Sequence, residues 1–154
     1  RYALSALALC RQKLLIQTGR SQGVSQAFSP QSESVGRPMR VLVCGSRDFT
    51  NRAFLFKALD GLHGEYGFSV VIHGAYRGAD QLAKDWAESR GIPDDPYPAD
   101  WKRLGSPAGP IRNQRMIDEG KPELVIAFPG QKGTRDMKRR ANKAGLKVIE
   151  PKDS

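Results

Sequence analysis

Residues 41–48 read Val-Leu-Val-Cys-Gly-Ser-Arg-Asp, an apolar run that ends at a glycine and is followed by charged side chains. A short apolar run without alternation is typical of a strand buried on both faces of a sheet. Just downstream, Thr50 or Asn51 can cap a helix whose apolar residues recur between positions 54 and 62. The segment predicts the first strand–turn–helix unit of an α/β fold.

The same pattern repeats along the chain. Further strands are predicted at 69–73, 124–128 and 147–149, and further helices at 79–87, at 110–119 with Pro110 first, and from a Thr134 cap to about 144. Residues 92–98 hold three prolines, so a strand there should be short and lie at an edge. The alternation predicts a doubly wound, mainly parallel Rossmann-like sheet of about five strands with helices on both faces.

Residues 1–38 differ in composition from the rest. They hold five Lys or Arg and one acidic residue, whereas residues 39–154 hold twenty Lys or Arg and fifteen acidic residues. The net charge of the whole chain is +9. A cleaved leader, a transit-like peptide and an upstream extension without a folded role all fit this composition. We favour the last, because Met39 directly precedes the first strand. We therefore expect 1–38 to be disordered or non-native and 39–154 to be the folded domain.

The sequence lacks the features of membrane proteins and zinc proteins. No run approaches the ~18 apolar residues of a membrane span, and Cys10 and Cys44 have no CxxC or His-rich partner. Because Cys44 ends an apolar strand, we expect a buried thiol in a reducing cytoplasm. The positive charge suits an anionic ligand and only weakly suits nucleic acid.

The residues that follow the first two strands are candidate ligand contacts, because doubly wound folds bind ligands beyond the carboxyl ends of their strands. Gly45, Ser46 and Arg47 offer a close backbone approach, a hydroxyl and a guanidinium, although a tight turn with solvated charges also explains them.

The loop after the second strand contains two glycines and leads directly into a predicted helix. It holds Gly74, Gly78 and Asp80, and Asp80 also fits the positive end of a helix without any ligand. For His73, at the end of that strand, we favour a hydrogen-bonded core position over a ligand contact.

The loop after the 124–128 strand is the most informative. Pro129, Gly130, Gly133 and Thr134 precede or open a helix, where free backbone N–H groups favour phosphate.

A fourth loop opens the helix near Pro110. Arg112 and Asn113 suit a phosphate, a ribose or a base edge, and a solvated helix start explains them equally well.

Several common catalytic motifs are absent from the sequence. There is no GxxxxGK[ST], no GxGxxG after the first strand and no nucleophile-elbow arrangement. Walker-type NTP hydrolysis and ordinary NAD-dependent dehydrogenation are therefore not supported, and neither a metal site nor a cofactor is identified.

The loops occur in an order that resembles the YspA-like branch of the SLOG superfamily. The matching segments are Gly45 to Phe49, His73-Gly74, Gly78 to Asp80, Pro98 to Trp101, Ala108 to Asn113 and Phe128 to Met137. The resemblance covers about 39–150 and implies a Rossmann-like sheet that binds nucleotides or their derivatives. The wider superfamily includes the LOG phosphoribohydrolases and the DNA-processing protein DprA.

The resemblance also defines the alternatives. LOG enzymes carry a PGGxGTxxE stretch, but here Gln131 replaces the second glycine and Met137 the glutamate, while Asp136 lies one residue early, about 100° around a helix. The catalytic candidates are Asp136, with Asp80 as the alternative acid, and Arg112, which corresponds to the LOG arginine. A DprA-like function would bind single-stranded DNA on aromatics such as Trp101 and Tyr76.

The first expectation is therefore the binding of a nucleotide or nucleotide-derived ligand, related to NAD or ADP-ribose, in a sensor or processing role. Trp101, Arg112 and Asn113 would touch its ribose or base. Nucleoside 5'-monophosphate N-glycosidase activity and single-stranded nucleic-acid binding are the alternatives. The identity of the ligand, catalysis and the oligomeric state stay open, and an exposed helix pair is compatible with a homodimer.

Overall fold

The computed structural model describes residues 38–153. The extension that was expected to be disordered or non-native lies almost entirely outside this range. Cys10 also lies outside it. The described elements are β1 (Met39–Cys44), α2 (Arg52–Tyr66), β2 (Phe68–His73), α3 (Ala79–Ser89), β3 (Asp94–Pro96), α4 (Trp101–Leu104), α5 (Ala108–Asp118), β4 (Leu124–Ala127), α6 (Lys132–Lys143) and β5 (Lys147–Ile149).

The five strands form one parallel sheet in the order β3-β2-β1-β4-β5, so the predicted doubly wound sheet is confirmed. In the central strand, Val41 pairs with Val71 of β2 and with Leu124 of β4. The short strand β3 lies at an edge, as its prolines predicted. The chain builds from β1 outward to β3 and then returns to β4, so the strand order reverses between β1 and β4.

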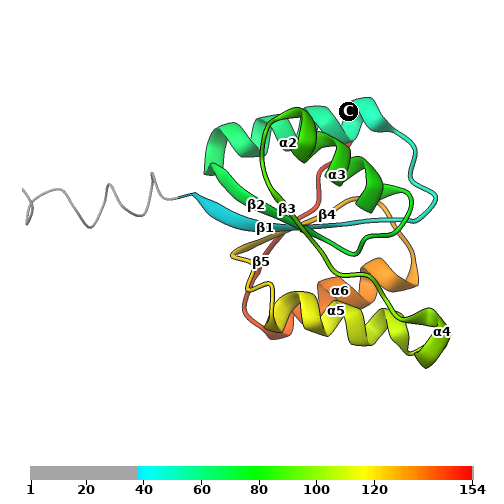
Figure 1. The fold of residues 1–154 in the computed structure, drawn as a ribbon. Helices are drawn as coiled ribbons and strands as arrows, with labels where there is room; N and C mark the ends of the chain where they lie inside the picture. Colours follow the sequence, from blue (N-terminus) through cyan, green and yellow to red (C-terminus); the bar gives the residue numbers. More distant parts are fainter. Residues whose placement is uncertain (1–37, 154) are drawn as a thin grey trace, which may run out of the picture. The chain divides into compact units, whose positions relative to one another are not determined.

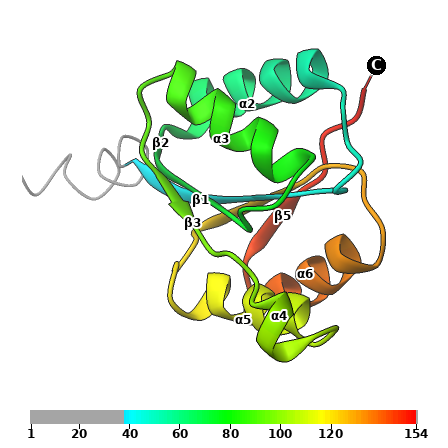
Figure 2. The same cartoon turned by 45° about the vertical axis from the view of Figure 1, so that its right-hand side comes forward.

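Helices α2 and α3 cover one face of the sheet, and α5 and α6 cover the other (Figures 1 and 2). Successive residues of β1 face opposite layers, as the pleat requires. Val41 and Val43 pack under α2 and α3 with Leu55 and Trp86. The core of the opposite layer contains Leu42, Cys44, Ile72, Met116, Ile117, Val125, Ala127, Met137 and Ala141.

Asn51, not Thr50, caps α2, because its side-chain oxygen accepts a hydrogen bond from the Phe54 amide at 3.1 Å. Helix α3 begins after Gly78, whose φ of 79° is a left-handed conformation. A Cβ at Gly78 would also collide with the Ser46 carbonyl oxygen. The glycine therefore lets the start of α3 press against the loop after β1.

Two predicted helix starts were wrong, and one short helix was not predicted. Helix α5 begins at Ala108 rather than Pro110, and the first turn tolerates this proline because its amide would have no helical partner. Helix α6 begins at Lys132, so Thr134 is a buried residue of the first turn and not the cap. The short helix α4 was not predicted; Asp100 caps it by accepting from the Arg103 amide at 3.1 Å.

Within residues 38–153, no helix combines the length and the apolar character needed to cross a membrane.

Candidate functional site

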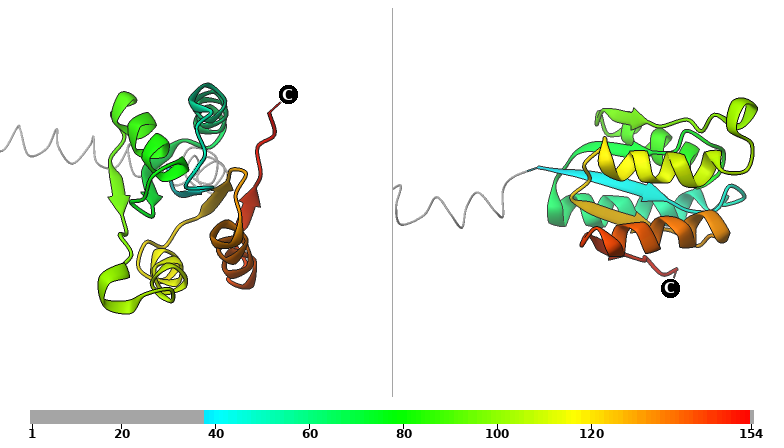
Figure 3. Two further views of the ribbon diagram at one scale, coloured as in Figure 1. Left: turned by 90° about the vertical axis from the view of Figure 1, so that its right-hand side faces the viewer. Right: turned by 90° about the horizontal axis from the view of Figure 1, so that it is seen from below.

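A cavity of about 870 Å³ opens at the carboxyl ends of β1 and β4, where the strand order reverses. Its walls come from the loop after β1, the start of α3, the α4–α5 segment and the first turns of α6. Figure 3 (left) looks onto this end of the sheet. Parallel sheets with this topology bind ligands at such a switch point.

Most of the predicted site residues line this cavity. They are Gly45, Ser46, Arg47, Asp80, Trp101, Arg112, Asn113, Gly133, Thr134 and Asp136. The other four, Gly74, Gly78, Pro129 and Gly130, lie in the supporting loops and are not part of its wall.

Backbone hydrogen bonds join the loops around Ser46. Its amide donates to the Pro129 carbonyl at 3.0 Å, which links the loops after β1 and β4. Its carbonyl accepts from the Ala79 amide at 3.0 Å, which adds the start of α3. The Ser46 hydroxyl oxygen accepts from the Asp48 amide at 3.0 Å. The Ser46 backbone is thus part of the frame of the cavity.

Gly130 allows this close approach. A Cβ at Gly130 would collide with the Thr134 hydroxyl and would lie 2.7 Å from Thr134 Cβ and 2.9 Å from the Ser46 nitrogen. Its role in the described structure is therefore packing between the two loops. Gly133, by contrast, has open space where a Cβ would stand.

Arg112 and Asp80 lie deep in the cavity. Arg112 donates through Nη1 to the Gly74 carbonyl and through Nε to Asn113 Oδ1 at 3.1 Å. The Asp80 carboxyl group lies against Gly74, since a Cβ at Gly74 would stand 2.7 Å from Asp80 Oδ2. Burial raises the pKa of Asp80, and the nearby charge of Arg112 opposes this only in part. Burial likewise lowers the pKa of Arg112 against the attraction of Asp80.

Asn113 and Asp136 form a polar link between α5 and α6. The Asn113 side-chain nitrogen donates to Asp136 Oδ2 at 3.0 Å and to the Gly133 carbonyl at 3.3 Å. Asp136 also accepts from Arg139 and from Arg140 Nε, the latter at 2.8 Å. Burial acts to raise the pKa of Asp136, but the hydrogen bonds from Arg140, Asn113 and Arg139 outweigh it and lower the pKa. Asp136 is therefore a carboxylate whose oxygens are largely occupied by neighbouring donors.

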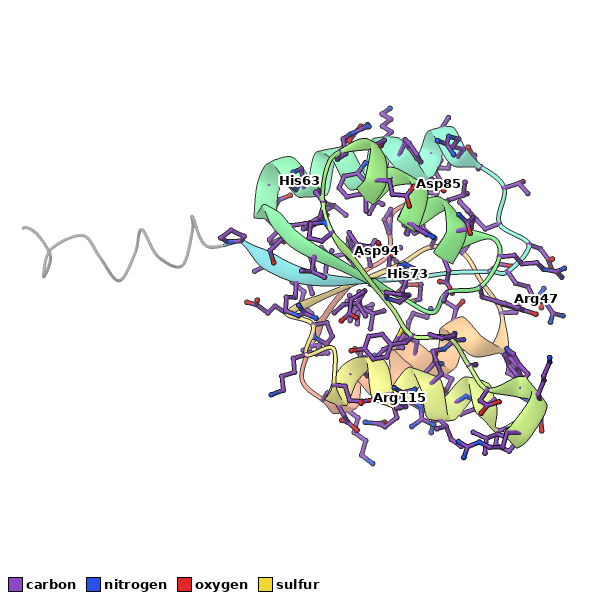
Figure 4. All side chains as sticks on the ribbon, in the orientation of Figure 1. Arg47, His63, His73, Asp85, Asp94 and Arg115 are labelled. Carbon is purple, nitrogen blue, oxygen red and sulfur yellow. The ribbon has the colours of Figure 1, made fainter. Side chains whose placement is uncertain are left out.

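His73 is a core residue, with 2% of its surface exposed. Its Nδ1 accepts from the Ala75 amide at 3.1 Å, so the proton lies on Nε2, which donates to Asp94 at 2.8 Å. Figure 4 labels both side chains on the edge of the sheet between β2 and β3. The favoured interpretation of His73 agrees with this geometry.

Cys44 lies at the floor of the cavity and is a free, buried thiol. Burial raises its pKa to about 12, which keeps the sulfur protonated and unsuited to act as a nucleophile. Among the described residues, no three His, Cys, Asp or Glu side chains gather as metal ligands.

Positive charge dominates the wall of the cavity. Six basic side chains line it, Arg47, Arg77, Arg112, Lys132, Arg135 and Arg139, against the two carboxylates of Asp80 and Asp136. Within residues 38–153, Arg47, Lys132 and Arg135 form no ion pair. Figure 4 shows Arg47 at this end of the sheet.

Lys132, Arg135 and Arg139 were not among the site residues predicted from the sequence. Their spacing of three and four residues places them on one side of a helix, but the expected helix began after Thr134. Only the earlier start of α6, at Lys132, reveals that Lys132 and Arg135 belong to a helix N-terminus beside the cavity.

Comparison with known proteins identifies the family. The family model described as "YspA, cpYpsA-related SLOG family" matches residues 39–104. The Gene 61 protein of Mycobacterium phage D29 is 42% identical over 119 residues, which cover 71% of this chain and 94% of the phage protein. The chain belongs to the YspA, cpYpsA-related SLOG family. The resemblance stated from the loop motifs is confirmed.

A similar fold is found among solved structures. DNA processing protein A (DprA) from Streptococcus pneumoniae superposes with a TM-score of 0.58 at 22% identity. The match covers 79% of this chain and 53% of DprA, so the chain spans about half the length of that protein. This likeness confirms the Rossmann-like fold. The SLOG model itself ends at Leu104, so the α5 and α6 walls of the cavity lie beyond the matched residues.

Proposed function

We propose that the cavity binds a nucleotide or a nucleotide-derived ligand, with a phosphate group at the N-terminus of α6. One observation carries the proposal. Within residues 38–153, no side chain caps the first turn of α6, and Arg47, Lys132 and Arg135, which form no ion pair there, line the same cavity at the switch point of the sheet. Helix N-termini attract anions through their free N–H groups and the helix dipole, and the cations add to that attraction.

The size of the cavity agrees with this class of ligand. Its volume of about 870 Å³ falls inside the range of about 300–1,000 Å³ of small-molecule sites. A mononucleotide or a dinucleotide related to NAD or ADP-ribose is therefore a better match than a polymer. In this proposal the ligand is sensed or processed as a free small molecule.

A second candidate function is hydrolysis of an N-glycosidic bond in a nucleoside 5'-monophosphate. It is favoured by the two carboxyl groups of the cavity, whose environments shift their pKa values in opposite directions. Asp80, with its raised pKa, is the better proton donor to a leaving base, because the oxygens of Asp136 are already engaged. Water would add across the bond, releasing the free base and ribose 5-phosphate.

A thermal-shift titration of the full chain tests the binding proposal. AMP, NAD, ADP-ribose and inorganic pyrophosphate would be compared with a short single-stranded oligonucleotide. We expect stabilisation by at least one small phosphate ligand, weakened in Arg135→Gln. Lys143→Gln, an exposed cation at the opposite end of α6, is the matched control and should behave as the wild type. If no phosphate compound stabilises the chain, the proposal is wrong.

Chromatography of the same mixtures tests the second candidate. Release of free base from AMP, abolished by Asp80→Asn and retained in Asp118→Asn, would identify the protein as an enzyme. If AMP stays intact after long incubation, hydrolysis is excluded and nucleotide binding remains the proposed function of the protein.

A further inference from the structure

Two aromatic side chains stand exposed beside the cavity. Tyr76 is 37% exposed and Trp101 is 44% exposed, and their ring centroids lie 6.1 Å apart at an interplanar angle of 40°. Both residues line the cavity. Large hydrophobic side chains that share an exposed site mark a surface for binding more often than isolated ones do.

The surrounding residues hold both rings in place. Trp101 is the first residue of α4, which Asp100 caps at one end and which Gly105 ends with a φ of 66°. Gly109 leaves room for the indole, since a Cβ there would lie 3.1 Å from Trp101 Cη2. Tyr76 follows Ala75, whose amide donates to Nδ1 of the buried His73 at 3.1 Å. The pair is thus anchored at its base, while a large part of each ring stays open to solvent.

The spacing of the pair determines how it can receive a third ring. Inserting a flat ring between two others needs a separation of about 7 Å, twice a van der Waals contact of about 3.5 Å. The observed 6.1 Å and the 40° tilt are too close for this. A planar group therefore has to stack on the open face of the pair.

Helix α6 lies on the other side of α5 from α4 (Figure 3, left), and the part of the cavity that it lines has a different character. There, the first turn of α6 presents backbone N–H groups together with Lys132 and Arg135. The cavity thus has two kinds of wall. The loop before α3 and helix α4 contribute an aromatic wall, and α6 contributes a cationic wall. A nucleotide has the matching two ends, a flat heterocycle and a phosphate.

We propose that Trp101 and Tyr76 form a stacking platform for the nucleobase, so that the ligand lies across the cavity with its base on this pair and its phosphate at α6. The proposal rests on the proposed function and adds the orientation of the ligand and a requirement for a base. Stacking accepts any base because every base has an aromatic face, so this wall selects nucleotides from other phosphate compounds rather than one base from another.

The test compares two ligands that differ only by the base. AMP and ribose 5-phosphate would be titrated calorimetrically into the full chain and into Trp101→Ala and Trp101→Phe. We expect Trp101→Ala to weaken AMP binding by about tenfold and to leave ribose 5-phosphate binding within about twofold of the wild type. Trp101→Phe should recover most of the loss, because phenylalanine can still stack.

Fluorescence gives an independent measurement. The second tryptophan, Trp86, is fully buried in the core under α2 and α3. AMP should quench the wild-type emission, ribose 5-phosphate should not, and Trp101→Phe should abolish the quenching while Trp86 still emits.

The outcomes separate the two proposals. Equal weakening of AMP and ribose 5-phosphate by Trp101→Ala, or AMP binding without quenching, would overturn the stacking platform and leave phosphate binding intact. Failure of the wild type to bind either compound or any ligand of the thermal-shift series would overturn both. Tighter binding of a short oligonucleotide than of AMP, with the same dependence on Trp101, would show that the stacked base belongs to a polymer and overturn the assignment to a free nucleotide.

Discussion

The side-chain nitrogen of Asn113 donates a hydrogen bond to Asp136 Oδ2 at 3.0 Å and joins α5 to α6 beside the cavity. Asn113 is 5% exposed, so this bond is shielded from water. Arg140 Nε donates to the same carboxylate oxygen at 2.8 Å, and Arg139 donates to the other. Asn113 was a candidate for ligand contact and Asp136 a candidate for catalysis, yet their observed hydrogen bonds hold α5 and α6 together.

Replacing Asp136 should therefore destabilise the fold. In Asp136→Asn the charge that binds two guanidinium groups is lost, and we expect the free energy of unfolding to fall by about 1–2 kcal/mol at pH 7. Urea denaturation measures this loss. Asp118→Asn is the control, because Asp118 is an exposed carboxylate on α5 that, within residues 38–153, accepts only from Gln114. It should change stability by less than about 0.5 kcal/mol.

The contribution of Asp136 should also depend on pH. Its pKa is lowered in the folded state, so its stabilisation is fully present above the ordinary value of about 4 and is lost as the pH falls through the lowered pKa. The difference in stability between the wild type and Asp136→Asn should therefore narrow below about pH 4. A difference that stays constant down to complete acid unfolding would contradict the assignment.

Asp80 should show the opposite pH dependence. Burial raises its pKa in the folded state, so its contribution is fully present below about pH 4 and is lost as the pH rises through the raised pKa. From pH 4 upward, the wild type should lose stability relative to Asp80→Asn. Urea titrations of both proteins at several pH values test this. Parallel curves for the two proteins would refute the proposed environment of Asp80.

Gly130 and Gly133 should respond differently to the same substitution. Gly130→Ala forces a methyl group against Thr134 and the Ser46 amide, and it should cost about 1–3 kcal/mol of stability. Gly133→Ala meets no atom within 4 Å and should keep or slightly raise the stability of α6. Because Gly133 lines the cavity, its added methyl should weaken phosphate binding. Thermal denaturation with and without pyrophosphate distinguishes the two effects, and a Gly133→Ala variant with wild-type affinity would argue against a phosphate at this turn.

Much of the fold could be predicted because its signals are local. Apolar runs that end at glycines identify the strands, and Trp86 lies on an apolar face with helical spacing. The start of α5 could not be predicted in the same way. Pro107, Gly109 and Pro110 together are typical of a loop, and they fit a helix only because first-turn amides have no helical partner to lose.

The location of the site could be predicted from the sequence, but the contacts between its side chains could not. Strand ends and glycine-rich loops indicate where the cavity lies, because the topology brings them to one edge of the sheet. The pairing of Asn113 with Asp136 depends on how α5 packs against α6, and residues 23 positions apart carry no local signal of it. The contact between Tyr76 and Trp101 depends in the same way on the unpredicted helix α4.

The most direct test of nucleotide binding in the cavity is an NMR titration of the ¹⁵N-labelled full chain with AMP and with ADP-ribose. Binding at the proposed site predicts saturable shifts of the amide resonances of Ser46, Gly133 and Thr134. The amides of His63, which lies toward the opposite end of the sheet from Arg47 (Figure 4), and of Phe68, the first residue of β2, should not move. Unchanged spectra at millimolar ligand, or shifts confined to other surfaces, would contradict the account.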